Sequence, residues 1–165
     1  HKAERDPLTG IYNRAVFEKY VNEVLADSSK RQHAFFLLDI DDFKNVNDSR
    51  GHAFGDTVLC ELTANLERSF RSSDLLGRIG GDEFCVLLKD EASEACCAAT
   101  LQALLAERRK TLAILPTVSL GSAVFSGEDV VAVKDRADRA LYCAKKEQKA
   151  RAAAAKHGDD SERTA

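Results

Sequence analysis

The chain of 165 residues has no tryptophan, no methionine and only 2 prolines, and its formal net charge of −3 leaves it without a basic excess. Without overall positive charge, the composition argues against a nucleic-acid partner and against direct contact with an acidic membrane surface. No apolar run approaches the roughly 18 residues that a membrane-spanning helix requires. No signal peptide is recognisable, so nothing in the sequence argues for export.

Length and composition are those of one globular domain. The chain is 44% hydrophobic and 31% charged, and its length allows a sizeable core. The 5 cysteines are odd in number and show no Cys-x-x-Cys spacing. We therefore expect buried, reduced thiols and a cytoplasmic location, with no zinc site. Since the chain lacks an initiating methionine, we expect it to be part of a longer protein.

The most informative stretch is a pair of glycines followed by two carboxylates. Gly80 and Gly81 lie between two apolar runs, which predicts a β-hairpin turn, because glycine reaches positive φ without steric cost. Bare backbone at the glycines would let an anionic ligand approach Asp82 and Glu83 closely. The combination indicates a divalent metal that holds a phosphate, and a solvated turn is the alternative for these four residues taken alone.

A second group of carboxylates follows the apolar run over residues 33–38. A short continuous run of this kind predicts a central strand buried on both faces. The run ends at Asp39, and Asp41 and Asp42 come soon after it. The carboxyl end of a buried strand is a common place for a ligand or metal. Capping of the next helix is the alternative for Asp41 and Asp42, and it fits Asp39 less well.

Hydrophobic periodicity predicts the other elements. Helices are expected over residues 16–25, 43–48, 55–70, 93–109 and 130–146. Strands are expected on both sides of the two glycines and over residues 116–125. The order gives an α+β fold with a β-α-β-β-α-β core of the ferredoxin-like or polymerase-palm type, a mainly antiparallel sheet, helices on one face and additional helices. We place the domain at residues 1–149 and expect residues 150–165 to extend the last helix and then become disordered.

Five separated motifs together resemble the GGDEF domain of diguanylate cyclases, a bacterial family. They lie at residues 6–14, 39–48, 51–56, 80–84 and 137–145. Their order and spacing match the family over about residues 5–149, which is very improbable by chance. The resemblance implies a palm-like nucleotidyltransferase that condenses two GTP into cyclic di-GMP and releases two pyrophosphates. It also allows the chain to be the cytoplasmic part of a longer, membrane-anchored protein.

By that resemblance, two Mg²⁺ ions, or Mn²⁺ in their place, act in each active site. The expected ligands are Asp39, the backbone carbonyl of Ile40, and Asp82 or Glu83. Asp82 and Glu83 are also the expected catalytic residues, because phosphoryl transfer depends on positioning and charge neutralisation. The sequence leaves open which of the two acts as a base.

The resemblance also implies contacts with the nucleotide. Asn47 and Asp56 would read guanine, since a carboxylate accepts from N1–H and the exocyclic amine together, and helix capping is the alternative for both. The expected phosphate contacts are Phe43, Lys44, Gly80, Gly81, Lys145 and Lys149. The chain departs from the family at residues 148–150, where Gln148, Lys149 and Ala150 replace the usual Gly-Arg-Asn. Lysine keeps the charge there but lacks the bidentate fork of arginine.

A second binding site is implied by Arg71 and Asp74, which match the RxxD pattern of the family's inhibitory product site. Five residues separate Asp74 from Gly80. Arginine can bind guanine through O6 and N7, and aspartate can accept from N1–H and the amine. Arg78 is expected to assist, and a surface ion pair at a helix end is the alternative.

The resemblance implies a homodimer during turnover, because one domain would bind one GTP. An upstream sensor or dimerisation domain in the full-length protein would align the two copies. A catalytically weak module that senses GTP or cyclic di-GMP is the second hypothesis, and retention of Asp39, Asp82 and Glu83 argues against it. A different nucleotidyl cyclase or polymerase-like palm is the third hypothesis, and Asn47 and Asp56 argue against that one.

Overall fold

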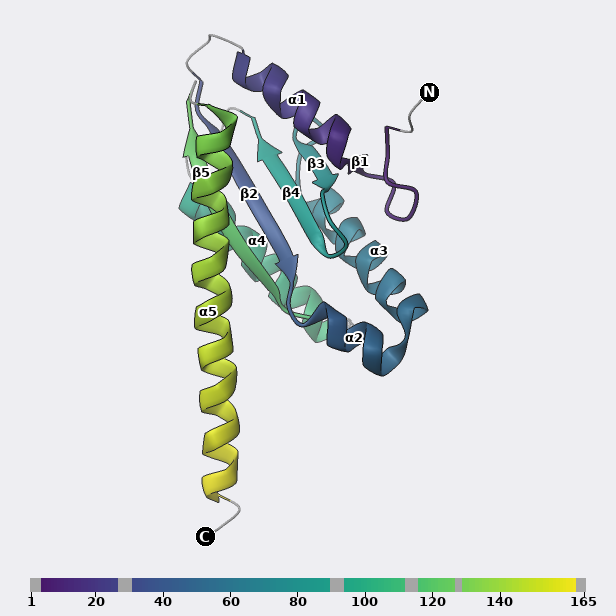
Figure 1. The fold of residues 1–165 in the computed structure, drawn as a ribbon, viewed down its shortest axis with the longest axis vertical. Helices are drawn as coiled ribbons and strands as arrows, with labels where there is room; N and C mark the ends of the chain where they lie inside the picture. The colour runs from purple at the N-terminus through teal and green to yellow at the C-terminus, as the bar shows by residue number, and fades with distance from the viewer. Residues whose placement is uncertain (1–3, 27–30, 90–93, 112–115, 127–128, 163–165) are drawn as a thin grey trace.

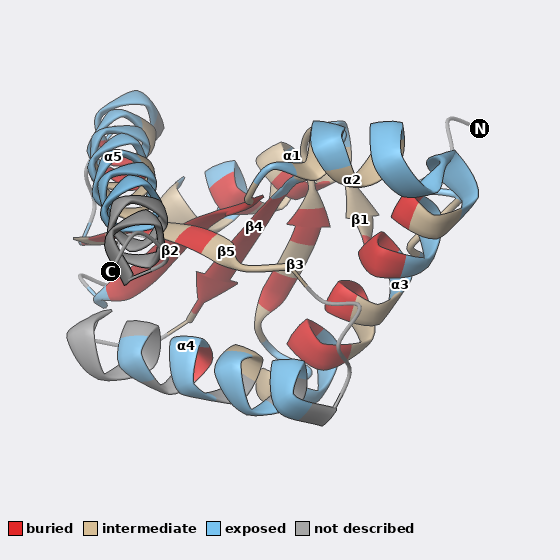
Figure 2. Cartoon of the chain, turned by 90° about the horizontal axis from the view of Figure 1, so that it is seen from below, coloured by how far each residue is buried: buried red, intermediate tan, exposed pale blue. Residues whose placement is uncertain are grey.

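A computed structural model describes residues 4–26, 31–89, 94–111, 116–126 and 129–162 of the chain. They form a five-stranded sheet of order β1-β3-β4-β2-β5 with helices on both sides (Figures 1 and 2). The strands are β1 (Tyr12–Asn13), β2 (His33–Ile40), β3 (Leu75–Arg78), β4 (Glu83–Leu88) and β5 (Val118–Phe125). The helices are α1 (Arg14–Ala26), α2 (Phe43–Arg50), α3 (His52–Ser69), α4 (Glu94–Thr111) and α5 (Val130–Glu162).

The sheet is mixed and mostly antiparallel, as the sequence predicted. Strands β3 and β4, β4 and β2, and β2 and β5 pair antiparallel, while β1 pairs parallel with β3. Strand β1 was not predicted, because its two residues show no alternation and lie in a stretch with turn composition. The order of the other strands and helices agrees with the predicted β-α-β-β-α-β core.

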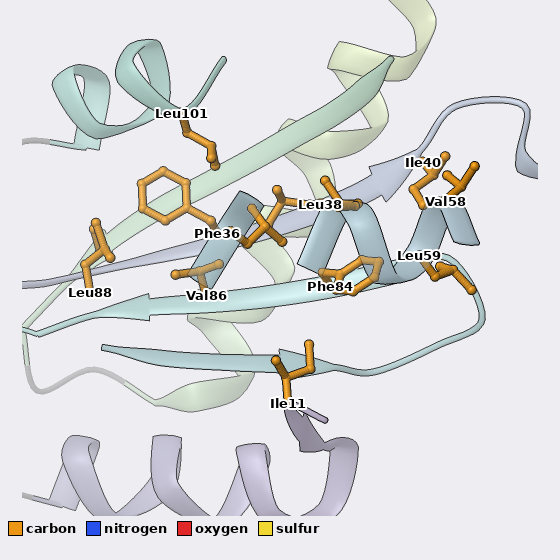
Figure 3. Close-up of a cluster of buried hydrophobic side chains, with 13 residues drawn as sticks. Ile11, Phe36, Leu38, Ile40, Val58, Leu59, Phe84, Val86, Leu88 and Leu101 are labelled. Atoms are coloured by element: carbon orange, nitrogen blue, oxygen red, sulfur yellow. The ribbon is translucent and has the colours of Figure 1, made fainter. Parts of the chain in front are cut away.

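Strand β2 lies between β4 and β5, and all 8 of its residues are buried. Phe36 and Leu38 join a hydrophobic cluster with α3 and α4 (Figure 3), whereas Phe35 and Leu37 join a second cluster with α1 and α5. The two clusters lie on opposite faces, since successive side chains of a strand point to opposite sides. The expectation of helices on one face only is therefore wrong. A strand buried along its whole length needs cover on both faces.

The helices lie close to their expected positions. Helix α3 begins at His52, earlier than expected, and Phe70 follows its end with an extended backbone. Helix α5 runs from Val130 to Glu162, and its C-terminal half extends past the sheet in Figure 1. Of the residues 150–165 that were expected to extend the helix and then become disordered, α5 contains those up to Glu162, and residues 163–165 lie outside the described part. The domain division at residue 149 stays a prediction.

The described cysteine side chains differ in burial. Cys85 is buried, and burial raises the pKa of its thiol far above the usual range. Cys60 and Cys143 are exposed, so the expectation of buried thiols is wrong for these two, and all three are unbridged. The side chains of Cys96 and Cys97 lie outside the described part.

In the described residues, no helix is long and apolar enough to cross a membrane.

Candidate functional site

Carboxylates from two neighbouring strands meet at one end of the sheet. Asp39 in β2 lies directly opposite Glu83, the first residue of β4. The amide of Ile40 donates to the carbonyl of Asp82 at 3.2 Å. Asp39 is buried and Glu83 is exposed. The structure therefore brings together the four residues predicted as metal ligands, which are Asp39, Ile40, Asp82 and Glu83. Their burial decreases from the buried Asp39 and Ile40 to the exposed Glu83.

Lys145 of α5 reaches this end of the sheet. Its Nζ lies 2.7 Å from Asp39 Oδ2, and 9% of the Asp39 side chain is exposed. Burial raises the pKa of Asp39, the charges of Asp82 and Glu83 raise it further, and the hydrogen bond from Lys145 opposes the rise without cancelling it. Because negative charge is crowded here, the site favours a cation or a cationic side chain.

The donor atoms fit a Mg²⁺ ion that arrives together with a phosphate ligand. In the described ranges, no three side chains of His, Cys, Asp or Glu form a ready-made metal cluster. Mg²⁺ does not need one, because it is usually held by one or two carboxylates, with phosphate oxygens and water in the other positions. Asp39 and Glu83, side by side in register, supply hard oxygen donors of this kind.

The loop between β3 and β4 is built differently from the expectation. Neither Gly80 nor Gly81 has a positive φ, so the reason given for these glycines was wrong. A Cβ at Gly80 would lie 2.5 Å from Glu83 Oε2, so the Glu83 side chain would have to shift to accommodate it. A Cβ at Gly81 would meet nothing within 4 Å. The first glycine thus makes room for the Glu83 carboxylate, and the second leaves open space beside it.

Arg78 ties this loop to the N-terminal turn. Its guanidinium donates to the carbonyls of Gly80 at 3.2 Å and Gly81 at 2.7 Å, and Nη1 donates to Asp6 Oδ1 at 3.0 Å. Asp6 also accepts from the amide and the hydroxyl of Thr9. Burial alone would raise the pKa of Asp6, but the hydrogen bonds from Thr9 and Arg78 outweigh it, so this pKa lies below its usual value.

The sequence missed the structural role of this pair. Asp6 was assigned no contact, and Arg78 was placed in the inhibitory site. Two sequence features could have indicated the pairing. Arg78 lies two residues before Gly80, and the Asp6 carboxylate lies in a turn that contains Pro7. A role of Arg78 in product binding stays a prediction.

Asn47 and Asp56 come from α2 and α3, two helices that contact each other and follow β2 in the chain. Asn47 is partly buried on α2, and Asp56 is exposed near the start of α3. Gly55 makes room for the Asn47 side chain, because a Cβ at Gly55 would clash with Asn47 Oδ1 and would lie 3.2 Å from Phe43 Cζ. The Asn47 amide is thus held against the start of α3, the helix that carries Asp56.

The first turn of α2 carries two of the predicted phosphate contacts, Phe43 and Lys44. Asp42 precedes it in the left-handed region, with φ of 54°, and makes no side-chain capping hydrogen bond. The first amides of a helix are free to bind anions, which suits a phosphate at this end. Lys44 and Lys149 are exposed, so neither is committed to the core.

Arg71 and Asp74 lie at the opposite end of the β3–β4 hairpin, just before β3. The Asp74 carboxylate accepts from the amides of Arg71 at 2.9 Å and Lys89 at 3.3 Å. Arg71 itself is exposed and lines a hollow of about 450 Å³ together with Arg5 and Tyr12. The geometry fixes the carboxylate through backbone amides, which leaves the guanidinium free to turn toward a ligand.

Comparisons with known proteins agree on one family. The family model described as "Diguanylate cyclase, GGDEF domain" matches residues 3–151. Diguanylate cyclase TpbB from Pseudomonas aeruginosa is 35% identical over 157 residues, which cover 89% of this chain and 36% of that protein. The chain thus spans about a third of that relative's length.

Solved structures agree with the sequence comparison. Diguanylate cyclase SiaD from Pseudomonas aeruginosa, in complex with its activator SiaC, is 34% identical with a TM-score of 0.78, covering 88% of this chain and 59% of that one. The GGDEF domain of DgcB from Caulobacter crescentus, in complex with c-di-GMP, is 29% identical with a TM-score of 0.79, covering 90% of both chains.

Proposed function

The chain belongs to the GGDEF domain family of diguanylate cyclases, and on that premise we propose that it condenses two GTP into cyclic di-GMP and releases two pyrophosphates. The observation that carries this proposal is the register that sets Asp39 opposite Glu83, beside the helix pair that bears Asn47 and Asp56. The register supports a metal site at the carboxyl end of β2, which is followed in the chain by the helices whose side chains would read guanine.

Asp39, the carbonyl of Ile40, and Asp82 or Glu83 would hold Mg²⁺, or Mn²⁺ in its place. A bound divalent ion would supply charge neutralisation at the phosphates and increase the acidity of the attacking 3′-hydroxyl. Glu83 is exposed at the start of β4, so its carboxylate can reach a hydroxyl presented from the solvent side. The buried Asp39 is better suited to stay in place as an anchor.

Asn47 and Asp56 would select guanine. Adenine lacks both N1–H and the 2-amine, so it would leave the Asp56 carboxylate without its donors, which is a costly mismatch. The triphosphate would lie against the first turn of α2, with Phe43 and Lys44, and against Gly80, Gly81, Lys145 and Lys149. Lys145 would then exchange its partner Asp39 for a phosphate oxygen.

Arg71 and Asp74 would bind cyclic di-GMP as an inhibitory product. Arg78 could help only by releasing Asp6 and the carbonyl of Gly81, which its guanidinium binds at the other end of β3. The support is the exposed Arg71 beside a hollow and the rigidly held Asp74. The DgcB domain was solved in complex with c-di-GMP, a finding about that protein that makes the ligand reasonable here. Since one domain offers one GTP site, turnover would need two copies face to face, aligned by segments of a longer protein.

The alternative is a catalytically weak module that binds GTP or cyclic di-GMP. The test is incubation of the purified domain at high concentration with GTP and Mg²⁺, followed by chromatography for cyclic di-GMP. We expect product that increases more than linearly with protein concentration and disappears in Glu83→Ala. Binding of GTP with no product at any concentration would favour the sensing module.

A further inference from the structure

A closed polar circuit joins α5, β5 and the segment after β2. The side-chain amide of Gln148 lies 2.5 Å from Thr117 Oγ1 and 2.7 Å from Ser119 Oγ. Ser119 Oγ lies 2.5 Å from Asp41 Oδ1. The backbone amide of Asp41 donates to the carbonyl of Thr117 at 2.9 Å, which closes the ring. Three segments far apart in the sequence are thus held by a few hydrogen bonds.

The proton count determines how the Gln148 amide is oriented in this circuit. Ser119 has a single hydroxyl proton, and the short contact with the Asp41 carboxylate takes it. The structure sets Gln148 Oε1 toward Ser119 and Nε2 toward Thr117. The opposite amide orientation, with NH₂ toward Ser119 and the oxygen toward the Thr117 hydroxyl, gives every contact a donor. The two ends of an amide have nearly the same shape, so this orientation fits the same space. Each contact then has one donor and one acceptor.

The circuit is sheltered from water. Ser119 is 3% exposed, and the other three members are partly buried. Hydrogen bonds in such surroundings face less competition from solvent, and their loss leaves polar groups unsatisfied. A glycine at position 148, the residue usual in the family, has no side chain to make these contacts. The circuit is therefore a property of this chain's own residues.

The circuit connects the two halves of the candidate site. Asp41 directly follows Ile40, and Gln148 lies three residues after Lys145, so these two side chains of α5 share one face. Lys145 Nζ in turn lies 2.7 Å from Asp39 Oδ2. A rotation of α5 that moved Lys145 away from Asp39 would also break the hydrogen bonds of Gln148.

We propose that Gln148 is a positioning residue that holds α5 in the register in which Lys145 faces Asp39 and the triphosphate of bound GTP. The inference rests on the proposed function for the identity of that ligand. It acts through Lys145 and does not require Gln148 to touch the nucleotide.

The test compares Gln148→Met, which keeps the length and helix propensity but removes the amide, with Glu147→Met at the exposed neighbouring position. The ligand is the Mg²⁺ complex of a GTP analogue with methylene between the α- and β-phosphorus, which cannot release pyrophosphate. By calorimetry we expect Gln148→Met to bind about tenfold more weakly and Glu147→Met to stay within about twofold of the parent.

A double-mutant cycle separates positioning from general destabilisation. In a Lys145→Met background, Gln148→Met should cost less than about twofold in analogue binding, because the residue through which it acts is gone. Binding within about twofold of the parent in the single Gln148→Met variant, or an undiminished loss in the double variant, would overturn the proposal.

Amide hydrogen exchange provides a readout that needs no nucleotide. We expect the Asp41 amide and the α5 amides around Lys145 to exchange about tenfold faster in Gln148→Met and unchanged in Glu147→Met. Unchanged exchange in Gln148→Met would contradict the circuit. A parent domain that fails to bind the GTP analogue would refute the proposed function instead, and the exchange rates would still decide whether Gln148 fixes these segments.

Discussion

Lys145 Nζ and Asp39 Oδ2 form an ion pair at 2.7 Å between the last helix and the end of the central strand. The pair neutralises a carboxylate whose pKa is raised by burial and by the nearby Asp82 and Glu83. Binding of GTP with a metal ion would replace this pair with stronger interactions. The metal ion would bind Asp39, and a phosphate oxygen would bind Lys145. We regard the pair as the ligand-free arrangement of the site.

Lys145→Met should weaken binding of the Mg²⁺–GTP analogue by about ten- to a hundredfold, the usual loss for one charge-assisted hydrogen bond. Lys146→Met is the matched control, because Lys146 lies on the Tyr142 ring, 4.7 Å from its centroid, and not at the carboxylates. Calorimetry would give both affinities. Equal affinities for the Lys145 variant and the control would show that Lys145 does not meet the triphosphate.

Arg78→Met should lower the free energy of unfolding by about 3 kcal/mol, because it removes the ion pair with Asp6 and leaves two loop carbonyls without the guanidinium donor. Urea denaturation followed by circular dichroism measures the change. Arg68→Met, at an exposed position in the last turn of α3, should change stability by no more than about 0.5 kcal/mol. A loss for Arg78→Met no larger than that of the control would contradict the role assigned to this guanidinium.

The Asp6 carboxylate should make part of the stability sensitive to acid. Its pKa in the folded state is lowered from the ordinary value of 3.8, so its contribution is present above that value and is lost as the pH falls through the folded-state pKa. Asp6→Asn should therefore be less stable than the parent at pH 7, and the difference should shrink below about pH 4. A difference that stays constant between pH 7 and pH 3 would exclude this linkage.

Gly55→Ala should weaken guanine recognition although alanine favours helices, because its Cβ would clash with Asn47 Oδ1. We expect the preference for GTP over ATP to fall by about tenfold or more, since hydrogen-bonded base readers are sensitive to displacement. Competition binding with the two nucleotides measures it, and Thr57→Ala on the exposed side of α3 should leave the preference unchanged. An unaltered preference in Gly55→Ala would separate Asn47 from base reading.

The sequence predicted those parts of the fold that leave a periodic or compositional pattern. Continuous apolar runs predicted β2, β4 and their burial, and helical spacing predicted the positions of the helices. The two-residue strand β1 was missed because it carries no pattern. The helices on the second face were missed because the β-α-β-β-α-β order suggested a sheet with helices on one face only. The full burial of β2 already required cover on both faces.

The candidate site was predictable where its residues form contiguous motifs and not where they meet only through the fold. Asp39 and Glu83 were singled out from two motifs, and the sheet register explains why the motifs belong together. The contact of Arg78 with Asp6 joins residues 72 positions apart, and that of Ser119 with Asp41 joins residues 78 positions apart. Such partners depend on side-chain distances, which no one-dimensional pattern contains.

The most direct test of the central claim is to fuse a dimeric coiled coil to the amino terminus and assay the fusion with GTP and Mg²⁺. We predict cyclic di-GMP with two pyrophosphates for each product molecule, and no product from the same fusion carrying Glu83→Ala. A fused dimer that binds GTP but forms no cyclic di-GMP would contradict the assignment as a cyclase.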